Sequence, residues 1–119
     1  MTEPKRLPSQ IHLSEMLDYN PSTGRLTWRV RPRHHFEKVG TWKAWNTRYA
    51  GKPALAGTDT EGYRSGCLGS VGRVKAHRII WKLIHGEEPE AIDHINHIRT
   101  DNRLRNLRAV SAGENCRNI

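Results

Sequence analysis

Four polar side chains near the C-terminal end of this 119-residue sequence have types and a spacing that suit hydrolytic chemistry. Asp93 and His94 are adjacent, Asn106 follows twelve residues after His94, and Asn115 is nine residues further on. A carboxylate and an amide can bind a hard divalent cation through oxygen. An imidazole can take a proton from water near neutral pH, and a second amide can fix the loop that orients it. The set therefore predicts metal-assisted hydrolysis of a phosphodiester bond.

Each of these residues has a simpler explanation when it is taken alone. Asp93 and His94 would then be a turn or cap pair, Asn106 a turn residue, and Asn115 an exposed helix residue. We prefer the catalytic interpretation because all four occur together at this spacing. Since adjacent residues of a strand point to opposite faces, Asp93 and His94 can serve one phosphate only if the strand ends or bends there.

The residues around this set resemble the HNH endonuclease family, in particular its small phage-encoded and homing-type members. The resemblance is carried by residues 93–96, 99–108 and 114–115, and it extends to residues 76–81 and 19–28.

The resemblance implies a role for each residue of the set. Asp93 and Asn115 would be metal ligands, and His94 would be the general base. Asn106 would hydrogen-bond the backbone across the loop and fix the orientation of His94. Ligation by oxygen alone favours a single Mg²⁺ or Mn²⁺ ion over a tightly held Zn²⁺. His97 occupies a position where relatives often carry glycine. It would be either an exposed loop residue or an extra contact to metal or phosphate.

The implied activity is metal-dependent endonuclease cleavage of double-stranded DNA, as a nick or a double-strand break. The alternative is a non-catalytic DNA-binding protein that retains the HNH fold, although a binding protein does not need the complete set. RNA binding or cleavage ranks last, because the sequence has no obvious aromatic platform for stacking bases.

The charge distribution supports a nucleic-acid partner. The formal net charge is +8, and residues 1–52 hold ten Lys and Arg against four acidic residues. A protein this basic is expected to bind a polyanion. Arg29, Arg31 and Arg33 alternate along a short run, and we predict that they contact phosphates rather than serve solubility alone.

A second group of arginines lies between the two halves of the C-terminal motif. Arg103 and Arg105 share a face if their segment is extended, and with Arg99 they could clamp a phosphate. The alternative is a solvated basic loop.

The order of patterns predicts an α+β fold with two lobes. Residues 1–88 would form a basic DNA-binding lobe, with a small antiparallel sheet and an amphipathic helix at residues 77–85 on which Ile80, Trp81 and Ile84 share a face. We expect strands at residues 25–30, 63–68 and 73–76 and a short helix capped by Ser14. Residues 31–50 are expected to form a mobile basic loop. Within it, Trp42 and Trp45 would either pack against the protein or lie against DNA. Strands followed by a helix also resemble an AP2-like DNA-binding module.

Residues 89–119 would form the second lobe, a ββα-metal (HNH) motif. Strands are expected at residues 91–94 and 107–110, with a long polar loop between them. Ser111 and Glu114 fit a capping box that begins a short terminal helix carrying Asn115.

Other features restrict the class of protein. Only 35% of residues are hydrophobic, so the core must be small, and we find neither an apolar run long enough for a membrane span nor a secretory signal. Cys67 and Cys116 are too few for a disulfide framework.

His77 is expected to be a buried, hydrogen-bonded structural residue, and no acidic or cysteine partner supports a metal site at His34 and His35. We expect a cytoplasmic protein, in a bacterial host cell if phage-encoded, that is a monomer or weak dimer.

Overall fold

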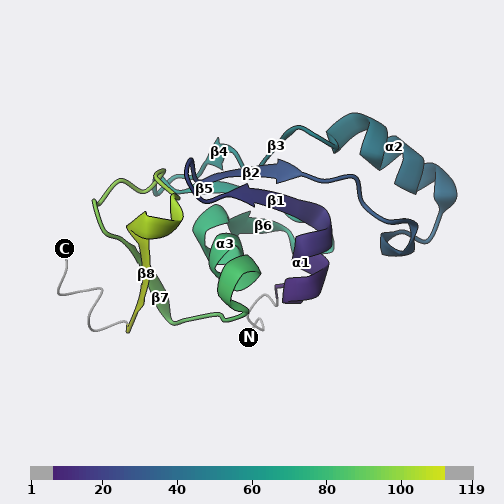
Figure 1. The fold of residues 1–119 in the computed structure, drawn as a ribbon. Helices are drawn as coiled ribbons and strands as arrows, with labels where there is room; N and C mark the ends of the chain where they lie inside the picture. Colours follow the sequence, from purple (N-terminus) through teal and green to yellow (C-terminus); the bar gives the residue numbers. More distant parts are fainter. Residues whose placement is uncertain (1–6, 112–119) are drawn as a thin grey trace.

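The computed structural model describes residues 7–111, and this part of the chain is a mixed α+β fold of small antiparallel sheets and helices (Figure 1). Three α-helices, two three-stranded sheets and one two-stranded hairpin are present within these residues. The predicted fold class is therefore confirmed. No helix in this range has the length and apolar character needed to cross a membrane.

The first sheet follows a short helix. Helix α1 (Gln10–Met16) begins after Ser9, whose hydroxyl oxygen accepts a hydrogen bond from the His12 amide at 3.1 Å, so the predicted start at Ser14 was wrong. The chain continues directly into β1 (Leu17–Asn20), which pairs with β2 (Arg25–Trp28), and β2 pairs with β3 (Pro53–Ala54). The predicted strand from residue 25 thus exists and ends at Trp28.

Helix α2 (Val39–Tyr49) interrupts this sheet between β2 and β3, where the sequence predicted a mobile loop. The prediction missed the helical spacing of Val39, Trp42, Trp45 and Tyr49, which the charged and polar residues between them obscure. None of the residues of the helix is buried. The preceding segment makes a single turn of 3-10 helix at Arg33–His35. In Figure 1, α2 projects away from the rest of the molecule.

The second sheet consists of β4 (Gly57–Thr58), β5 (Arg64–Cys67) and β6 (Arg73–Lys75), and it leads directly into α3 (Ala76–His85). The predicted strands and helix are confirmed. The buried face of α3 differs in detail, because Ile79 and Ile80 are fully buried whereas Ile84 is 39% exposed. The order of three strands and a helix is the one that suggested an AP2-like module, and that likeness stays a prediction.

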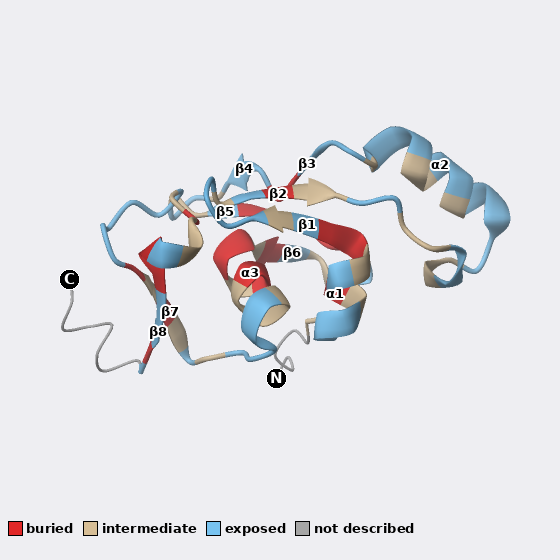
Figure 2. Ribbon diagram, in the orientation of Figure 1, coloured by how far each residue is buried: buried red, intermediate tan, exposed pale blue. Residues whose placement is uncertain are grey.

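The C-terminal hairpin pairs β7 (Ala91–His94) with β8 (Leu107–Val110), and both strands lie where they were predicted. The hairpin shares the hydrophobic core of the rest of the chain, since Ile92 and Leu107 belong to the same cluster as Leu13 and Ile79 (Figure 2). The boundary predicted between residues 88 and 89 falls in the connector from α3 to β7. The division into two lobes stays a prediction.

Candidate functional site

The end of strand β7 positions the first two residues of the predicted site. Pairing with β8 places Asp93 opposite Arg108 and His94 opposite Leu107. The strand ends at His94, which is the condition under which the two side chains can serve one phosphate. Their surroundings differ, because His94 is buried at 4% exposure whereas Asp93 is only partly buried.

Asp93 is held by its cross-strand neighbour. Its Oδ2 accepts a hydrogen bond from Arg108 Nε at 3.1 Å and lies 3.1 Å from Arg108 Nη2. Within residues 7–111, Oδ1 has no hydrogen-bond partner, so one carboxylate oxygen is available for a hard cation. Asp93 therefore fits the role of one oxygen ligand. The second predicted ligand, Asn115, lies outside the described residues, as does the predicted capping residue Glu114.

The imidazole of His94 is fixed by an asparagine that sequence reasoning missed. Its Nε2 lies 2.8 Å from Oδ1 of Asn102, which is itself only 3% exposed. An amide oxygen can only accept, so Nε2 carries the proton and Nδ1 holds the lone pair of the neutral ring. The Asn102 backbone is anchored in turn, because its carbonyl oxygen accepts a hydrogen bond from the Tyr19 hydroxyl at 2.6 Å. Asn102 thus selects the tautomer of His94.

Two further rings complete the surroundings of His94. The His77 ring lies 5.0 Å away in an edge-on arrangement, and the Tyr63 ring lies 5.8 Å away. His77 is buried, as predicted, but its Nδ1 has no hydrogen-bond partner in the described structure, contrary to the prediction. Burial foremost, and then the nearby His94, lower the pKa of His77 to about 3. His77 is therefore neutral at physiological pH.

Asn106 closes the loop that follows His94. Its Oδ1 accepts a hydrogen bond from the Asn96 amide at 3.0 Å, and its Nδ2 donates to Asn96 Oδ1 at 2.9 Å and to the Asp101 carbonyl at 2.8 Å. Its backbone oxygen accepts from the Ile95 amide. Asn106 thus bonds the backbone across the loop, while the side-chain contact to His94 comes from Asn102.

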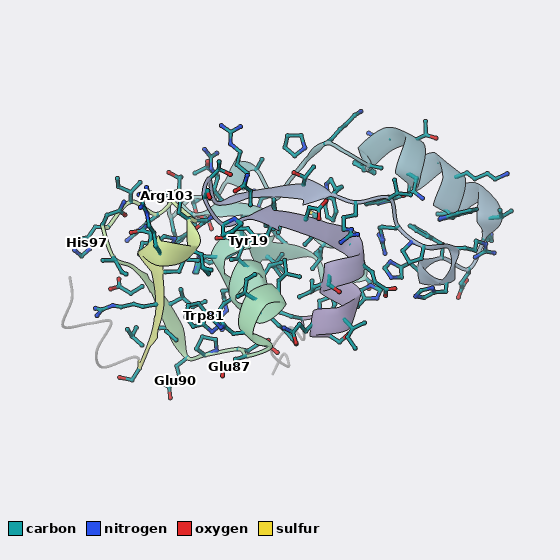
Figure 3. All side chains as sticks on the ribbon, viewed as in Figure 1. Tyr19, Trp81, Glu87, Glu90, His97 and Arg103 are labelled. Carbon is teal, nitrogen blue, oxygen red and sulfur yellow. The ribbon has the colours of Figure 1, made fainter. Side chains whose placement is uncertain are left out.

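His97 occupies a tight turn in the same loop. Its amide donates to the His94 carbonyl oxygen at 2.8 Å, and its φ of 65° lies in the left-handed region that favours glycine. This conformation is a physical reason for glycine at that position in relatives. His97 and Arg103 lie at the end of the molecule opposite α2 (Figure 3).

The three loop arginines have different surroundings. Arg103 binds Asp101 through Nε at 2.8 Å and Nη2 at 2.7 Å, and this pairing foremost, with Asn96, holds the pKa of the Asp101 carboxyl well below its usual range. Arg99 donates to the Glu61 carbonyl oxygen and lies over the Tyr63 ring. Arg105 is exposed and has no such partner among residues 7–111, so it is the most available of the three for a phosphate.

Arg29 and Arg33, in the N-terminal half of the chain, also form hydrogen bonds within the protein. Arg29 donates to the Ser14 carbonyl oxygen at 3.2 Å and lies 3.6 Å from an Asp18 oxygen. Arg33 donates to the carbonyl oxygens of Phe36 and Glu37.

Arg31 is the most enclosed arginine of this run. Its Nε donates to His35 Nδ1 at 3.0 Å, and its guanidinium lies over the rings of Phe36 and Trp45. The run therefore has clear roles inside the fold, and its phosphate contacts stay a prediction.

The structure supplies the acidic partner that the sequence did not reveal for His34 and His35. Glu15 Oε1, from α1, lies 3.2 Å from His35 Nε2 and 3.5 Å from His34 Nε2, and the His12 ring stacks on His35 at 4.1 Å. Because Arg31 donates to Nδ1 of His35, the proton of that ring lies on Nε2 and points at the carboxylate. These side-chain contacts join α1 to the segment before α2.

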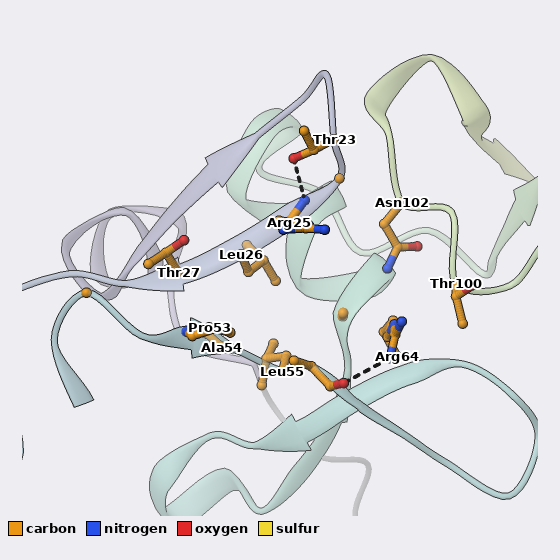
Figure 4. Close-up of a pocket in the computed structure, with 14 residues that line it drawn as sticks. Thr23, Arg25, Leu26, Thr27, Pro53, Ala54, Leu55, Arg64, Thr100 and Asn102 are labelled. Atoms are coloured by element: carbon orange, nitrogen blue, oxygen red, sulfur yellow. Dashed lines mark hydrogen bonds between the residues drawn. The ribbon is translucent and has the colours of Figure 1, made fainter. Parts of the chain in front are cut away.

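A shallow hollow of about 560 Å³ adjoins the back of the site (Figure 4). Asn102 and Thr100 border it on one side, and β2 and β3 border it on another. Arg25 and Arg64 line it, so its walls carry positive charge. Asn102 thus lies between this hollow and the ring of His94.

Comparison with known proteins identifies the C-terminal part of the chain. A sequence model of the family described as HNH endonuclease matches residues 74–117. The chain therefore carries an HNH motif. The match begins within β6, includes α3 upstream of the hairpin, and contains all four predicted site residues together with His77 and Asn102.

One solved structure has a related fold, described as "DNA binding and cleavage by the HNH homing endonuclease I-HmuI". The superposition has a TM-score of 0.52 at 21% sequence identity, and it covers 87% of this chain and 51% of that chain. This chain therefore spans about half the length of that protein. No curated protein shows a significant match.

Proposed function

We propose that this protein is an endonuclease that hydrolyses phosphodiester bonds of duplex DNA with His94 as general base and one divalent ion, Mg²⁺ or Mn²⁺. The observation that carries the proposal is the hydrogen bond from His94 to Asn102, because it leaves Nδ1 as the basic nitrogen of the ring. The HNH motif at residues 74–117 supports it. The reported DNA cleavage by I-HmuI, whose fold is similar, also supports it.

The reaction requires one proton transfer to this chain. His94 Nδ1 accepts a proton from a water molecule as the water oxygen bonds to phosphorus and the bond from phosphorus to the leaving 3′-oxygen breaks. Asn102 stabilises the resulting imidazolium, because its amide oxygen accepts from Nε2 in both protonation states. A divalent ion held by Asp93 and Asn115 would neutralise charge on the phosphate and the leaving oxygen. Arg105 is available to bind an adjacent phosphate.

A specific observation favours the alternative of a non-catalytic DNA-binding protein with the same fold. His94 is only 4% exposed, and Asp93 is paired with Arg108. In a nuclease the substrate must reach Nδ1, whereas a binding protein could keep both residues as internal supports.

Cleavage of supercoiled plasmid in Mg²⁺ or Mn²⁺ separates the two functions. We expect the parent protein to cut and His94→Ala to be slower by roughly a hundredfold or more, which is the usual loss of a general base. His85→Asn is the matched control, since His85 is an exposed histidine at the end of α3 and outside the proposed site. It should cut at nearly the parent rate. A His94→Ala protein as fast as the parent, with DNA binding intact, would favour the non-catalytic alternative.

A further inference from the structure

Helix α2 is attached to the rest of the molecule along one side only. Trp42 Nε1 donates to the Arg31 carbonyl oxygen at 2.8 Å, and Asn46 bonds both the amide and the carbonyl of Arg31. The ring of Trp45 meets that of Trp28 at 5.4 Å. Trp42 and Trp45 thus pack against the protein, which is one of the two alternatives that the sequence left open.

The opposite side of α2 is exposed to solvent in the described structure. Five exposed residues follow one another there at intervals of three and one, which places them on a single helical face, the outer face: Gly40, Lys43, Ala44, Thr47 and Arg48. A Cβ atom added at Gly40 would meet no atom within 4 Å. Three of the five side chains are small or absent, so a partner can approach the helix closely.

The charge of this region has one sign. Residues 38–52 contain Lys38, Lys43, Arg48 and Lys52 and no acidic residue. All four are exposed, and within residues 7–111 none of them forms a salt bridge. The Arg48 guanidinium lies 5.3 Å from the ring of its helix neighbour Tyr49. Arg29, Arg31 and Arg33 differ because their guanidiniums donate hydrogen bonds to protein groups.

The position of α2 suits a second anchor on a long polyanion. It lies at the end of the molecule opposite β7 and β8, and the long dimension of the protein is 49 Å (Figure 1). At about 3.4 Å per base pair this dimension corresponds to roughly 14 base pairs of duplex. A duplex bound at the nuclease site therefore has to extend, in one direction, by up to about that length to reach α2.

We propose that the outer face of α2 docks on the phosphate backbone of the DNA duplex that the nuclease site cuts, about one helical turn or more from the cut. This inference rests on the proposed function, because it takes the DNA bound at His94 as the partner. Lys43 and Arg48 contact phosphates, and Gly40, Ala44 and Thr47 let the helix approach the backbone. Lys38 and Lys52 flank the contact.

The test combines a charge-removing pair with a charge-keeping pair on the same helix. Lys43→Ala with Arg48→Ala removes two contacts, and alanine favours the helix, so the fold should persist by circular dichroism. Lys43→Arg with Arg48→Lys keeps both charges. Arg29→Ala with Arg33→Ala removes the same charge from side chains that the protein already binds.

We expect the alanine pair on α2 to make the slope of log affinity against log salt shallower by about 2 on a duplex of about 30 base pairs. The charge-keeping pair should restore the parent slope, and the Arg29 and Arg33 pair should change it less. On a duplex too short to reach from the cleavage position to α2, all four proteins should give the same slope. An unchanged slope for the α2 alanine pair on the long duplex would overturn the proposal.

Cleavage measured in parallel distinguishes this failure from failure of the proposed function. Single-turnover cutting at saturating DNA should be unaffected by the α2 substitutions, since α2 lies far from β7, the strand that carries Asp93 and His94 (Figure 1). If the parent protein cuts DNA and the Lys43→Ala, Arg48→Ala variant binds DNA with the same salt slope as the parent, only the role of α2 is refuted. A parent protein that binds DNA in Mg²⁺ and Mn²⁺ without cutting it refutes the nuclease.

Discussion

His94 and Asn102 form a buried hydrogen bond, with 2.8 Å between the imidazole Nε2 and the amide Oδ1. The bond sets which nitrogen of His94 is basic, and it connects the end of β7 to the far side of the loop. The Tyr19 hydroxyl holds the backbone of Asn102 in place. The orientation of the proposed general base thus depends on three segments that are distant in sequence.

Replacing this asparagine by an acid should change the pH dependence of cleavage. In Asn102→Asp, a carboxylate beside Nε2 favours the imidazolium, so the pKa of the base should rise. The rate at pH 7 should fall, and raising the pH should recover it, because only the neutral ring accepts a proton. Single-turnover rates from pH 5.5 to 9 measure the shift, and a profile that superimposes on the parent would show that Asn102 does not act through His94.

The proposed metal ligands make a separate prediction. Asp93→Ala and Asn115→Ala should remove the EDTA-sensitive activity and weaken Mn²⁺ binding. Arg108→Ala should strengthen Mn²⁺ binding severalfold, because Arg108 competes for Asp93 Oδ2 and adds a positive charge beside the ion. Electron paramagnetic resonance of Mn²⁺ measures the affinities independently of cleavage. Full activity of the parent in EDTA would rule out the metal.

His77 should make the fold sensitive to acid. Its pKa in the folded protein is about 3, below the ordinary 6.5, because burial disfavours the charged ring. The unfolded chain therefore takes up the proton first. The stability that neutral His77 provides is complete above pH 6.5 and is lost as the pH falls toward 3.

At pH 5 this loss amounts to about 2 kcal/mol. In His77→Phe, the free energy of unfolding should fall less between pH 7 and pH 5 than in the parent. Urea denaturation at both pH values measures the difference. Equal losses in the two proteins would show that the burial of His77 does not control acid sensitivity.

The sequence predicted the elements whose side chains follow a burial period. Helix α3 and the β7–β8 hairpin place apolar residues at regular intervals on the core, and both were found at the expected residues. Helix α2 was missed because its contacts are polar and aromatic and it buries no residue.

The parts of the site that were not predicted depend on tertiary contacts. Asn102 is one of several asparagines after His94, and nothing in the sequence distinguishes it from Asn96 until the loop closes. Glu15 lies 20 residues from His35, so their pairing requires the turn of chain between α1 and α2. Asn106, by contrast, was predicted from its place in the family motif, and its side chain bonds Asn96 and the Asp101 carbonyl.

The turn between β1 and β2 supports the same loop from the other side, and two glycines allow this support to be measured. Gly24 has a φ of 79°, and a Cβ atom there would lie 2.4 Å from the Asn102 carbonyl carbon. Gly51 has a similar φ of 82°, but a Cβ atom there would meet nothing within 4 Å. Alanine at either position therefore incurs the same backbone strain of about 1–2 kcal/mol, and only Gly24→Ala adds a collision with the loop that holds His94.

We expect Gly51→Ala to lower the free energy of unfolding by about that strain and to leave cleavage at saturating DNA unchanged. Gly24→Ala should be less stable than Gly51→Ala and should also cut more slowly, because the Asn102 backbone must move and the bond from Asn102 to His94 is disturbed. Chemical denaturation and single-turnover cleavage measure the two effects separately. Combining Gly24→Ala with Asn102→Ala should then slow cleavage hardly more than Asn102→Ala alone, since both act through one hydrogen bond. Multiplicative losses in the double variant would show that the turn affects catalysis by a route that does not pass through Asn102.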